Sequence, residues 1–145
     1  MHISLRRGEK IYINGAVIRV DRKVCVELLN DVTFLLEHHV MQANDADTPL
    51  KQIYFVVQMM LMCPNDTVAA SELFRTMHDS CLKAIKDTHI RRELDTVERF
   101  VKEKRNFDAL KTLRALFPIE QEILSAGAAR VVIQNAGKDE HGHAA

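Results

Sequence analysis

The dipeptide Asn14-Gly15 constrains the fold of this chain more than any other feature, because apolar and polar residues alternate on both sides of it. An Asn-Gly pair between alternating segments is the strongest short-range signal for a β-hairpin, since both central residues of a type I′ turn adopt positive φ. The two-residue loop places Lys10 opposite Arg19, and burial of the apolar face fixes that register. We expect one face to carry Ile11, Ile13, Ala16, Ile18 and Val20, and the outer face to carry Lys10, Tyr12, Val17 and Arg19.

Further strands are predicted on both sides of the hairpin. Residues 3–5 form a first strand and residues 24–28 a later one. The segment 32–37 is ambiguous, because it fits either a fifth strand or a short helix capped by Asp31. We favour the strand, since its Val, Thr and Phe residues prefer extended backbone.

The second half of the chain has helical periodicity. Thr48-Pro49 is an N-cap followed by proline at the first helical position, and the nearly all-apolar helix that it starts should end near Cys63 and lie in the core. Three more helices are expected over about 67–86, 89–104 and 106–117, the last of them ended by Pro118.

The predicted fold class is α+β, a small antiparallel β-sheet half followed by a helical half of about four helices. We expect a single domain over residues 1–136, with a β-rich part at 1–42 and a helical part at 48–117. The polar residues 137–145 are predicted to form a disordered tail.

The charge of the chain is balanced overall but unevenly spread. Twenty Lys and Arg match twenty Asp and Glu, which argues against a binder that covers its whole surface with cations. Residues 1–25 nevertheless hold six basic residues against two acidic ones, and residues 26–50 hold five acidic residues and no Lys or Arg. The three widely spaced cysteines and the lack of a secretory signal or a 20-residue apolar run predict a cytoplasmic protein outside the membrane.

No catalytic, cofactor or metal motif stands out. The chain has no phosphate-binding loop and no nucleophile elbow, and no Cys–His pair is singled out by its spacing. His78 and Cys81 are three residues apart on a predicted helix, but two ligands are a weak signal for zinc, and we favour a core cysteine beside a surface histidine. The adjacent His38 and His39 cannot easily share one ion. We therefore expect a protein that is not an enzyme and needs no cofactor.

The N-terminal ribbon is the candidate nucleic-acid surface. Binding of single-stranded RNA uses cations for phosphates and an aromatic ring for base stacking. The ribbon supplies both, and the candidate contact residues are Arg6, Arg7, Lys10, Tyr12, Arg19, Arg22 and Lys23. An ordinary exposed sheet face, whose charges prevent edge-to-edge pairing, remains the alternative. A second cluster, Lys102, Lys104 and Arg105, fits a solvated helix face better than a phosphate site.

Three blocks of the sequence, residues 5–23, 27–37 and 48–55, resemble the FlbT family of flagellar regulators. The resemblance implies a post-transcriptional regulator of flagellin synthesis that associates with the 5′ untranslated region of flagellin messenger RNA and promotes its decay or blocks its translation. It also implies a second small flagellar regulator, FlaF, as a partner, and a sign of regulation that differs among members. The family brings no catalytic residues.

Two functional interpretations stay open at this point. In the first, the ribbon binds the flagellin 5′ leader, no DNA is bound, and the helical half mediates partner contact or homo-oligomerisation. In the second, the protein is an adaptor or chaperone-like partner in flagellar assembly that affects messenger RNA only indirectly. The neutral total charge and the single aromatic residue of the ribbon favour the second.

Overall fold

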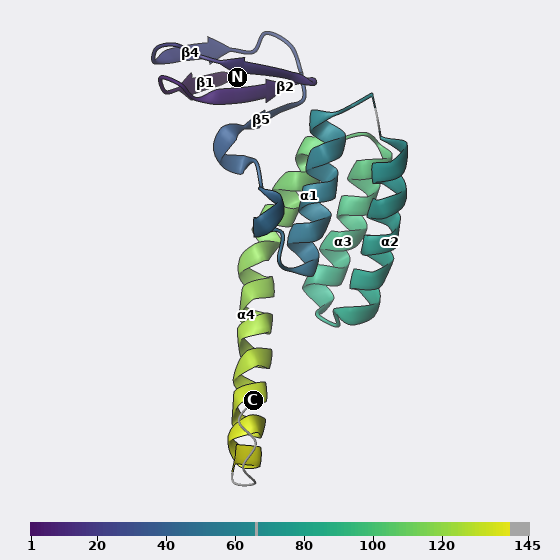
Figure 1. Cartoon of the computed structure of the whole chain (residues 1–145). Helices are drawn as coiled ribbons and strands as arrows, with labels where there is room; N and C mark the ends of the chain where they lie inside the picture. Colours follow the sequence, from purple (N-terminus) through teal and green to yellow (C-terminus); the bar gives the residue numbers. More distant parts are fainter. Residues whose placement is uncertain (66, 140–145) are drawn as a thin grey trace.

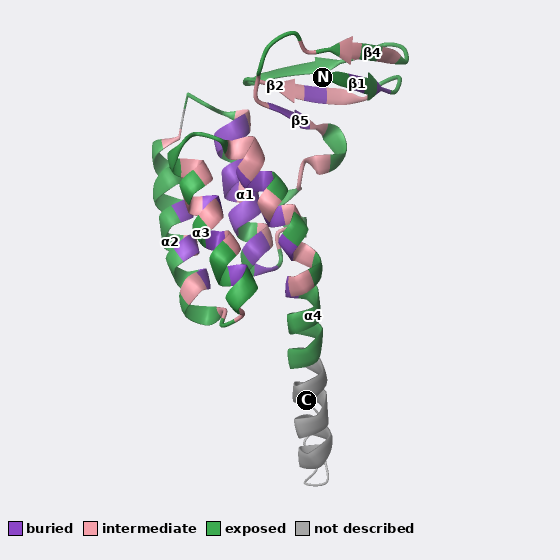
Figure 2. Ribbon diagram, turned by 180° about the vertical axis from the view of Figure 1, so that it is seen from behind, coloured by how far each residue is buried: buried purple, intermediate pink, exposed green. Residues whose placement is uncertain are grey.

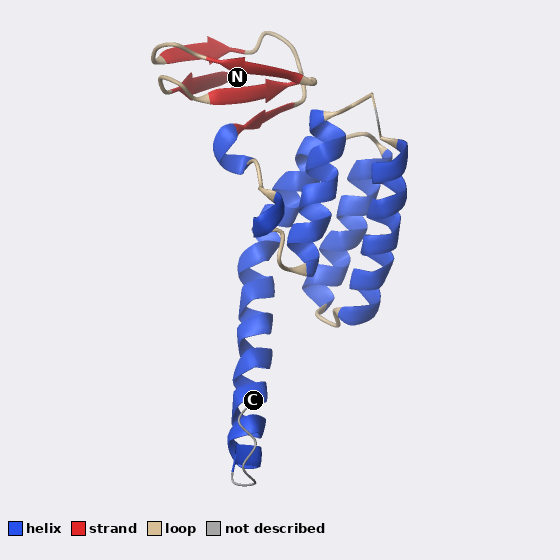
Figure 3. Cartoon of the chain, viewed as in Figure 1, coloured by secondary structure: helices blue, strands red, loops and turns tan. Residues whose placement is uncertain are grey.

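The computed structural model describes residues 1–65 and 67–139, with side chains described as far as residue 127. A β module, residues 1–36, lies at one end of a helical body, residues 49–139 (Figure 1; Figure 3). The strands of the β module are β1 (His2–Leu5), β2 (Lys10–Ile13), β3 (Ala16–Arg19), β4 (Val24–Glu27) and β5 (Phe34–Leu36). The helices follow in sequence, which confirms the predicted α+β class.

The β module consists of two small antiparallel sheets. One pairs β1 with β4, and the other has the order β3-β2-β5. Buried residues from both sheets meet in a small core formed by Ile3, Leu5, Ile11 and Phe34.

The hairpin has the predicted register, with Ile13 opposite Ala16 and Lys10 opposite Arg19. Asn14 and Gly15 adopt φ values of 46° and 86°, as a type I′ turn requires. The predicted apolar face is buried only in part, because every residue of the edge strand β3 is exposed.

The ambiguous segment 32–37 contains a strand, as favoured. β5 pairs with β2, and a 3₁₀ helix, η1 (Glu37–His39), follows it directly. Since successive strand residues face opposite sides, Phe34 contacts the core of the β module while Leu35 contacts the core of the helical body. β5 thus joins the two parts.

The chain then passes through a second 3₁₀ helix, η2 (Ala43–Asp45), into α1 (Pro49–Met62), α2 (Val68–Ala84), α3 (Thr88–Lys102) and α4 (Asn106–Asp139). The Thr48 hydroxyl accepts a hydrogen bond from Lys51 N (3.2 Å), which confirms the predicted cap of α1. The apolar α1 is in contact with α2 and α4, and eight of its residues are buried (Figure 2).

Pro118 does not end the last helix, contrary to the sequence prediction, since α4 continues through it to Asp139. A proline inside a helix removes one N–H donor and crowds the preceding turn, which costs about 3 kcal/mol. Contacts just beyond it offset that cost. Glu120 is buried and accepts hydrogen bonds from the Thr48 hydroxyl and from Leu50 N (2.9 Å) at the start of α1. A carboxylate at a helix N-terminus is further stabilised by the helix dipole.

The last part of α4 extends well past the other helices (Figure 1). Of the tail predicted over 137–145, residues 137–139 complete α4, and residues 140–145 lie outside the described residues. Within the described chain, no helix combines the length and apolar character needed to cross a bilayer.

Candidate nucleic-acid interface

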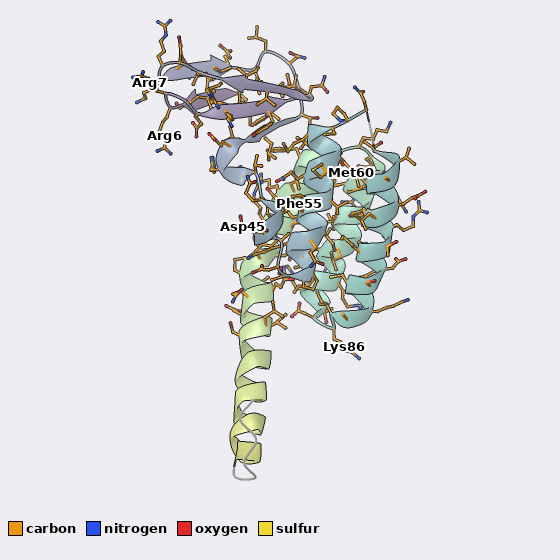
Figure 4. The ribbon with its side chains drawn as sticks, in the orientation of Figure 1. Arg6, Arg7, Asp45, Phe55, Met60 and Lys86 are labelled. Carbon is orange, nitrogen blue, oxygen red and sulfur yellow. The ribbon has the colours of Figure 1, made fainter. Side chains whose placement is uncertain are left out.

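Two turns of the β module, residues 6–9 and 20–23, lie side by side. Antiparallel pairing of β1 with β4 and of β2 with β3 brings them to the same end, and Gly8 N donates a hydrogen bond to Val20 O (2.8 Å). Figure 4 shows Arg6 and Arg7 projecting from this end of the sheets. We call its six cations the basic end: Arg6, Arg7, Lys10, Arg19, Arg22 and Lys23.

The cations of the basic end are exposed, apart from the half-buried Lys10. The acidic residues of the two turns offset them only partly. Asp21 lies 3.4 Å from Arg22 Nε, and both side chains are more than three-quarters exposed, so this pair contributes little. Glu9 accepts a hydrogen bond from the backbone N of Arg6 (3.0 Å), which leaves the guanidinium free to meet an anion. The basic end therefore presents net positive charge to solvent.

The other end of the hairpin is docked on the helical body. A Cβ placed on Gly15 would lie 3.3 Å from Pro64 Cδ, in the connection that follows α1. Asn14 N also donates to Thr33 O (3.0 Å), which ties the turn to the segment before β5. This end of the hairpin thus contacts the helical body, although Asn14 and Gly15 stay exposed, and the basic end lies at the opposite end of the hairpin.

Tyr12 lies apart from the basic end. It pairs with Val17 on one side and with Leu35 on the other, and its half-buried ring packs against the core of the helical body. Val17, predicted on the same face, is 61% exposed. The outer face of the hairpin is thus covered near Tyr12 and open near the edge strand. The structure brings six of the seven predicted contact residues together and places Tyr12 at the junction of the two parts.

The second basic cluster is mostly neutralised by neighbouring carboxylates. Lys102 Nζ lies 2.8 Å from Glu98, and Arg105 Nε lies 2.9 Å from Asp108. Lys102 and Glu98 are four residues apart on α3, a spacing at which opposite charges stabilise a helix. The hydrogen bond from Lys102 holds the pKa of Glu98 below its ordinary value, and the nearby His78 and Arg75 add to that effect while partial burial opposes it. The ion pairs fit the solvated-face interpretation.

A model of the family described as flagellar protein FlbT matches residues 1–124. The chain belongs to the FlbT family. It is 54% identical over 125 residues, 86% of each chain, to a protein of Chelativorans sp. named probable flagellum biosynthesis repressor protein FlbT. It is 50% identical over 136 residues, 94% of this chain and all of the relative, to the protein of Bradyrhizobium diazoefficiens named probable flagellum biosynthesis repressor protein FlbT 2. No solved structure matches it.

The FlbT membership confirms the resemblance noted in the sequence, and the relatives are named as repressors and not as enzymes. Among the described residues, one group has the donor types of a metal site: His78, Asp95 and Glu98, whose ligand atoms lie within 4.8 Å of one another. His78 is buried, contrary to the prediction of a surface histidine, and its Nε2 lies 2.9 Å from Leu94 O. His78 of α2 lies 3.5 Å from Glu98 of α3, and Glu98 also pairs with Lys102, so these two members of the group link the helices through an ion-pair network.

Cys81, considered in the sequence as a partner of His78, is a buried thiol. Burial raises its pKa to about 11, and the nearby Glu120 carboxylate adds to the effect. Metals bind the thiolate, so a thiol held in its neutral form is a poor ligand. This agrees with the prediction of a core cysteine.

One basic residue escaped the sequence reasoning. Arg114 belongs to α4 but lies beside Tyr54 of α1 and the paired imidazoles of His38 and His39, whose ring centroids are 4.0 Å apart. The sequence offered a weak signal, an arginine on the largely apolar helix 106–117. Its neighbours come from segments some 60 and 75 positions away in the chain, so only the fold reveals the grouping.

Proposed function

We propose that this FlbT protein regulates flagellin synthesis by binding the 5′ leader of flagellin messenger RNA without cutting it. The observation that carries the proposal is the basic end, where two turns bring four cations together beside Lys10 and Arg19 at the adjoining ends of β2 and β3. The names of the relatives as flagellum biosynthesis repressors support the regulatory part. Repression would follow from blocking ribosome entry or from exposing the message to nucleases supplied by others, with FlaF as a working partner.

The basic end fits single-stranded RNA because its cations stand on turns and strand ends and not along a helix that could enter a groove. Arg6, Arg7 and Arg22 would contact phosphates, for which a guanidinium offers a planar fork of donors. Stacking of a base on Tyr12 requires access to a ring that the helical body partly covers. The contacts of the cations therefore contribute most of the affinity in this proposal, and Tyr12 contributes through its exposed part.

The test compares a flagellin 5′ leader with a scrambled RNA of equal length over a range of salt concentrations. The variant Arg7→Gln, Arg22→Gln, Lys23→Gln removes three exposed charges of the basic end. Because each phosphate contact contributes about −0.7 to the log–log salt slope on single strands, we expect a slope near −4 for the wild type and about −2 for the variant.

A matched control, Lys83→Gln, Arg92→Gln, Lys111→Gln, removes three exposed charges from the helical body. It should leave the slope unchanged. If the basic-end variant and this control lose RNA affinity equally, the RNA is attracted by the net charge of the protein and not by a defined site. Tyr12→Leu keeps an apolar side chain against the core, so a loss of affinity in this folded variant would reveal base stacking.

The adaptor interpretation is favoured by exposed apolar residues. Val17 and Ile18 on β3 are 61% and 44% exposed, and Ile123 and Leu124 on the extending part of α4 are 42% and 43% exposed. Specific RNA affinity is absent in that case, so failure of the wild type to distinguish the leader from the scrambled RNA would select it.

A further inference from the structure

A shallow pocket of about 370 Å³ opens where η1, η2, α1 and α4 meet. Its polar lining consists of His38, His39, Asp45, Tyr54 and Arg114, and the aromatic ring of Phe117 forms part of its wall. Figure 4 shows Asp45 on η2, on the side of the molecule where η1 and the first part of α4 lie.

Arg114 is half-buried at this pocket and has only a neutral partner in the described structure. Its Nη1 donates to Tyr54 Oη (3.0 Å), and the tyrosine hydroxyl in turn donates to His39 O (2.5 Å). Among the residues with described side chains, no carboxylate comes within 4.0 Å of the guanidinium, although Asp45 lines the same pocket. A guanidinium has five donors, so several remain to bind an acceptor in the pocket.

Two imidazoles, those of His38 and His39, line the same space. Partial burial lowers the pKa of His39, and the positive charges of Arg114 and His38 lower it further. His39 therefore lies close to two other groups that can carry positive charge, and those charges disfavour protonation of its imidazole. The next cation, Lys51, lies 6.0 Å from the Phe117 ring and is paired with Asp47 (3.6 Å).

We propose that this pocket binds a phosphate group. A phosphate presents acceptor oxygens in several directions, and the pocket is lined by potential donors from two separate elements, the histidines of η1 and Arg114 of α4. Its negative charge would offset the effect of Arg114 on the imidazole of His39, and Arg binds phosphate through two parallel hydrogen bonds. A metal ion would meet the opposite situation, since the guanidinium repels cations.

The position of the pocket suggests how it relates to the basic end. Lys10 N, in the basic end, donates to Glu37 Oε2 (3.0 Å), and Glu37 is the first residue of η1, which also carries both histidines. The pocket thus begins one turn of 3₁₀ helix away from the basic end. The phosphate could belong to an RNA end or could be free, and the proposal does not depend on binding of the leader.

The test follows the imidazole protons of His38 and His39 by NMR while inorganic phosphate is added to the full-length protein at constant ionic strength. Bound phosphate favours the protonated imidazole, so the pKa of His39 should rise and saturate with phosphate concentration. Arg114→Gln should weaken phosphate binding by about tenfold or more, because a charge-assisted hydrogen-bond pair is lost. The proposal would be overturned if the pKa of His39 did not change with phosphate concentration, or if it changed by the same amount in Arg114→Gln as in the wild type.

Two further variants keep the test decisive. Arg92→Gln removes an exposed arginine that is not part of the pocket lining, and this variant should bind phosphate as the wild type does. If Arg114→Gln fails to fold, His38→Gln replaces it, because His38 is exposed and its loss should still weaken phosphate binding. An undiminished affinity in folded His38→Gln would count against the site.

The source of the phosphate is read from two short RNAs of one sequence, with a 5′-phosphate or a 5′-hydroxyl end. Tighter binding of the phosphorylated RNA, lost in the Arg114 or His38 variant, assigns the pocket to an RNA end. Equal binding of both RNAs, together with the response to inorganic phosphate, assigns it to free phosphate. The basic-end variant should keep its phosphate response, so failure of the leader proposal and failure of this one are distinguishable.

Discussion

The β module and the helical body differ in how much of themselves they bury. The β module encloses four buried residues between its sheets, and an entire strand, β3, is exposed. The helical body encloses a continuous core to which all four helices and one strand of the β module contribute. The small core cannot supply much stability by itself, since stabilisation by burial scales with the apolar area removed from water.

This difference in burial explains which part of the β module can carry charged residues that do not contribute to packing. The β module is fixed to the helical body at β5 and at the Asn14-Gly15 turn, so its opposite end is not needed for packing. Cations at that free end are exposed and make few contacts, which leaves them available for a ligand. Substitutions at the attached end should therefore lower the stability of the fold, whereas substitutions at the basic end should weaken RNA binding and leave the stability nearly unchanged.

The largest effect is expected at the attachment of the β module. Leu35→Ala removes a side chain that is 0% exposed and lies opposite Tyr12, so the free energy of unfolding should fall by about 2–5 kcal/mol. Val17→Ala, on the same sheet but 61% exposed, should change it by no more than about 0.5 kcal/mol. Urea unfolding followed by circular dichroism compares the two variants. Similar losses of unfolding free energy would show that Leu35 does not anchor the β module to the helical body.

The same contrast between an exposed β module and a buried helical core should appear in the rates at which the cysteines are alkylated. Cys25 of β4 is exposed, whereas Cys81 of α2 is buried and its pKa is raised from 9.0 to about 11. A thiol with a raised pKa holds less of the reactive thiolate, about a hundredfold less at pH 8 for a shift of this size. Alkylation at pH 8 with mass-spectrometric mapping should modify Cys25 first and Cys81 last, and the rate at Cys81 should rise as the pH approaches 11. Rapid labelling of Cys81 at pH 8 would contradict its burial.

Substitution of two glycines compares the hairpin turn that contacts the helical body, at Gly15, with the turn at the basic end, at Gly8. Gly15 and Gly8 have φ values of +86° and +81°, so alanine at either position costs about 1 kcal/mol in backbone strain. Only Gly15 also meets a neighbour, Pro64, at 3.3 Å, whereas a Cβ on Gly8 would meet nothing within 4 Å. Chemical unfolding should show the larger loss for Gly15→Ala, by roughly 1 kcal/mol. Equal losses of unfolding free energy in the two variants would show that Pro64 moves aside for the added methyl group without a measurable penalty.

The smallest effect on stability is expected at the basic end. Arg7→Gln, Arg22→Gln, Lys23→Gln should leave the free energy of unfolding within about 0.5 kcal/mol of the wild type, because exposed charges without packing contribute little. A thermal or urea unfolding curve on the protein used for the RNA titration checks this. A large loss would mean that the basic end is a structural element of the β module.

Local patterns were enough to predict much of the fold. Asn14-Gly15 gave the hairpin and its register, and the preferences of residues 32–37 gave β5, because turn geometry and extended backbone depend on near neighbours. The cap at Thr48 marked the start of α1 for the same reason. The prediction failed at Pro118, where the cost of a proline is offset by Glu120, whose partners lie about 70 residues earlier in the chain.

The candidate sites divide in the same way. The amino-acid sequence by itself determined which cations stand in turns and that Asn14-Gly15 reverses the chain, since both follow from adjacent residues. Only the tertiary structure decided that β1 pairs with β4, that Tyr12 packs on the helical body, and that Arg114 lies beside His38 and His39. These outcomes depend on contacts between distant segments, whose free energies no local window of sequence contains.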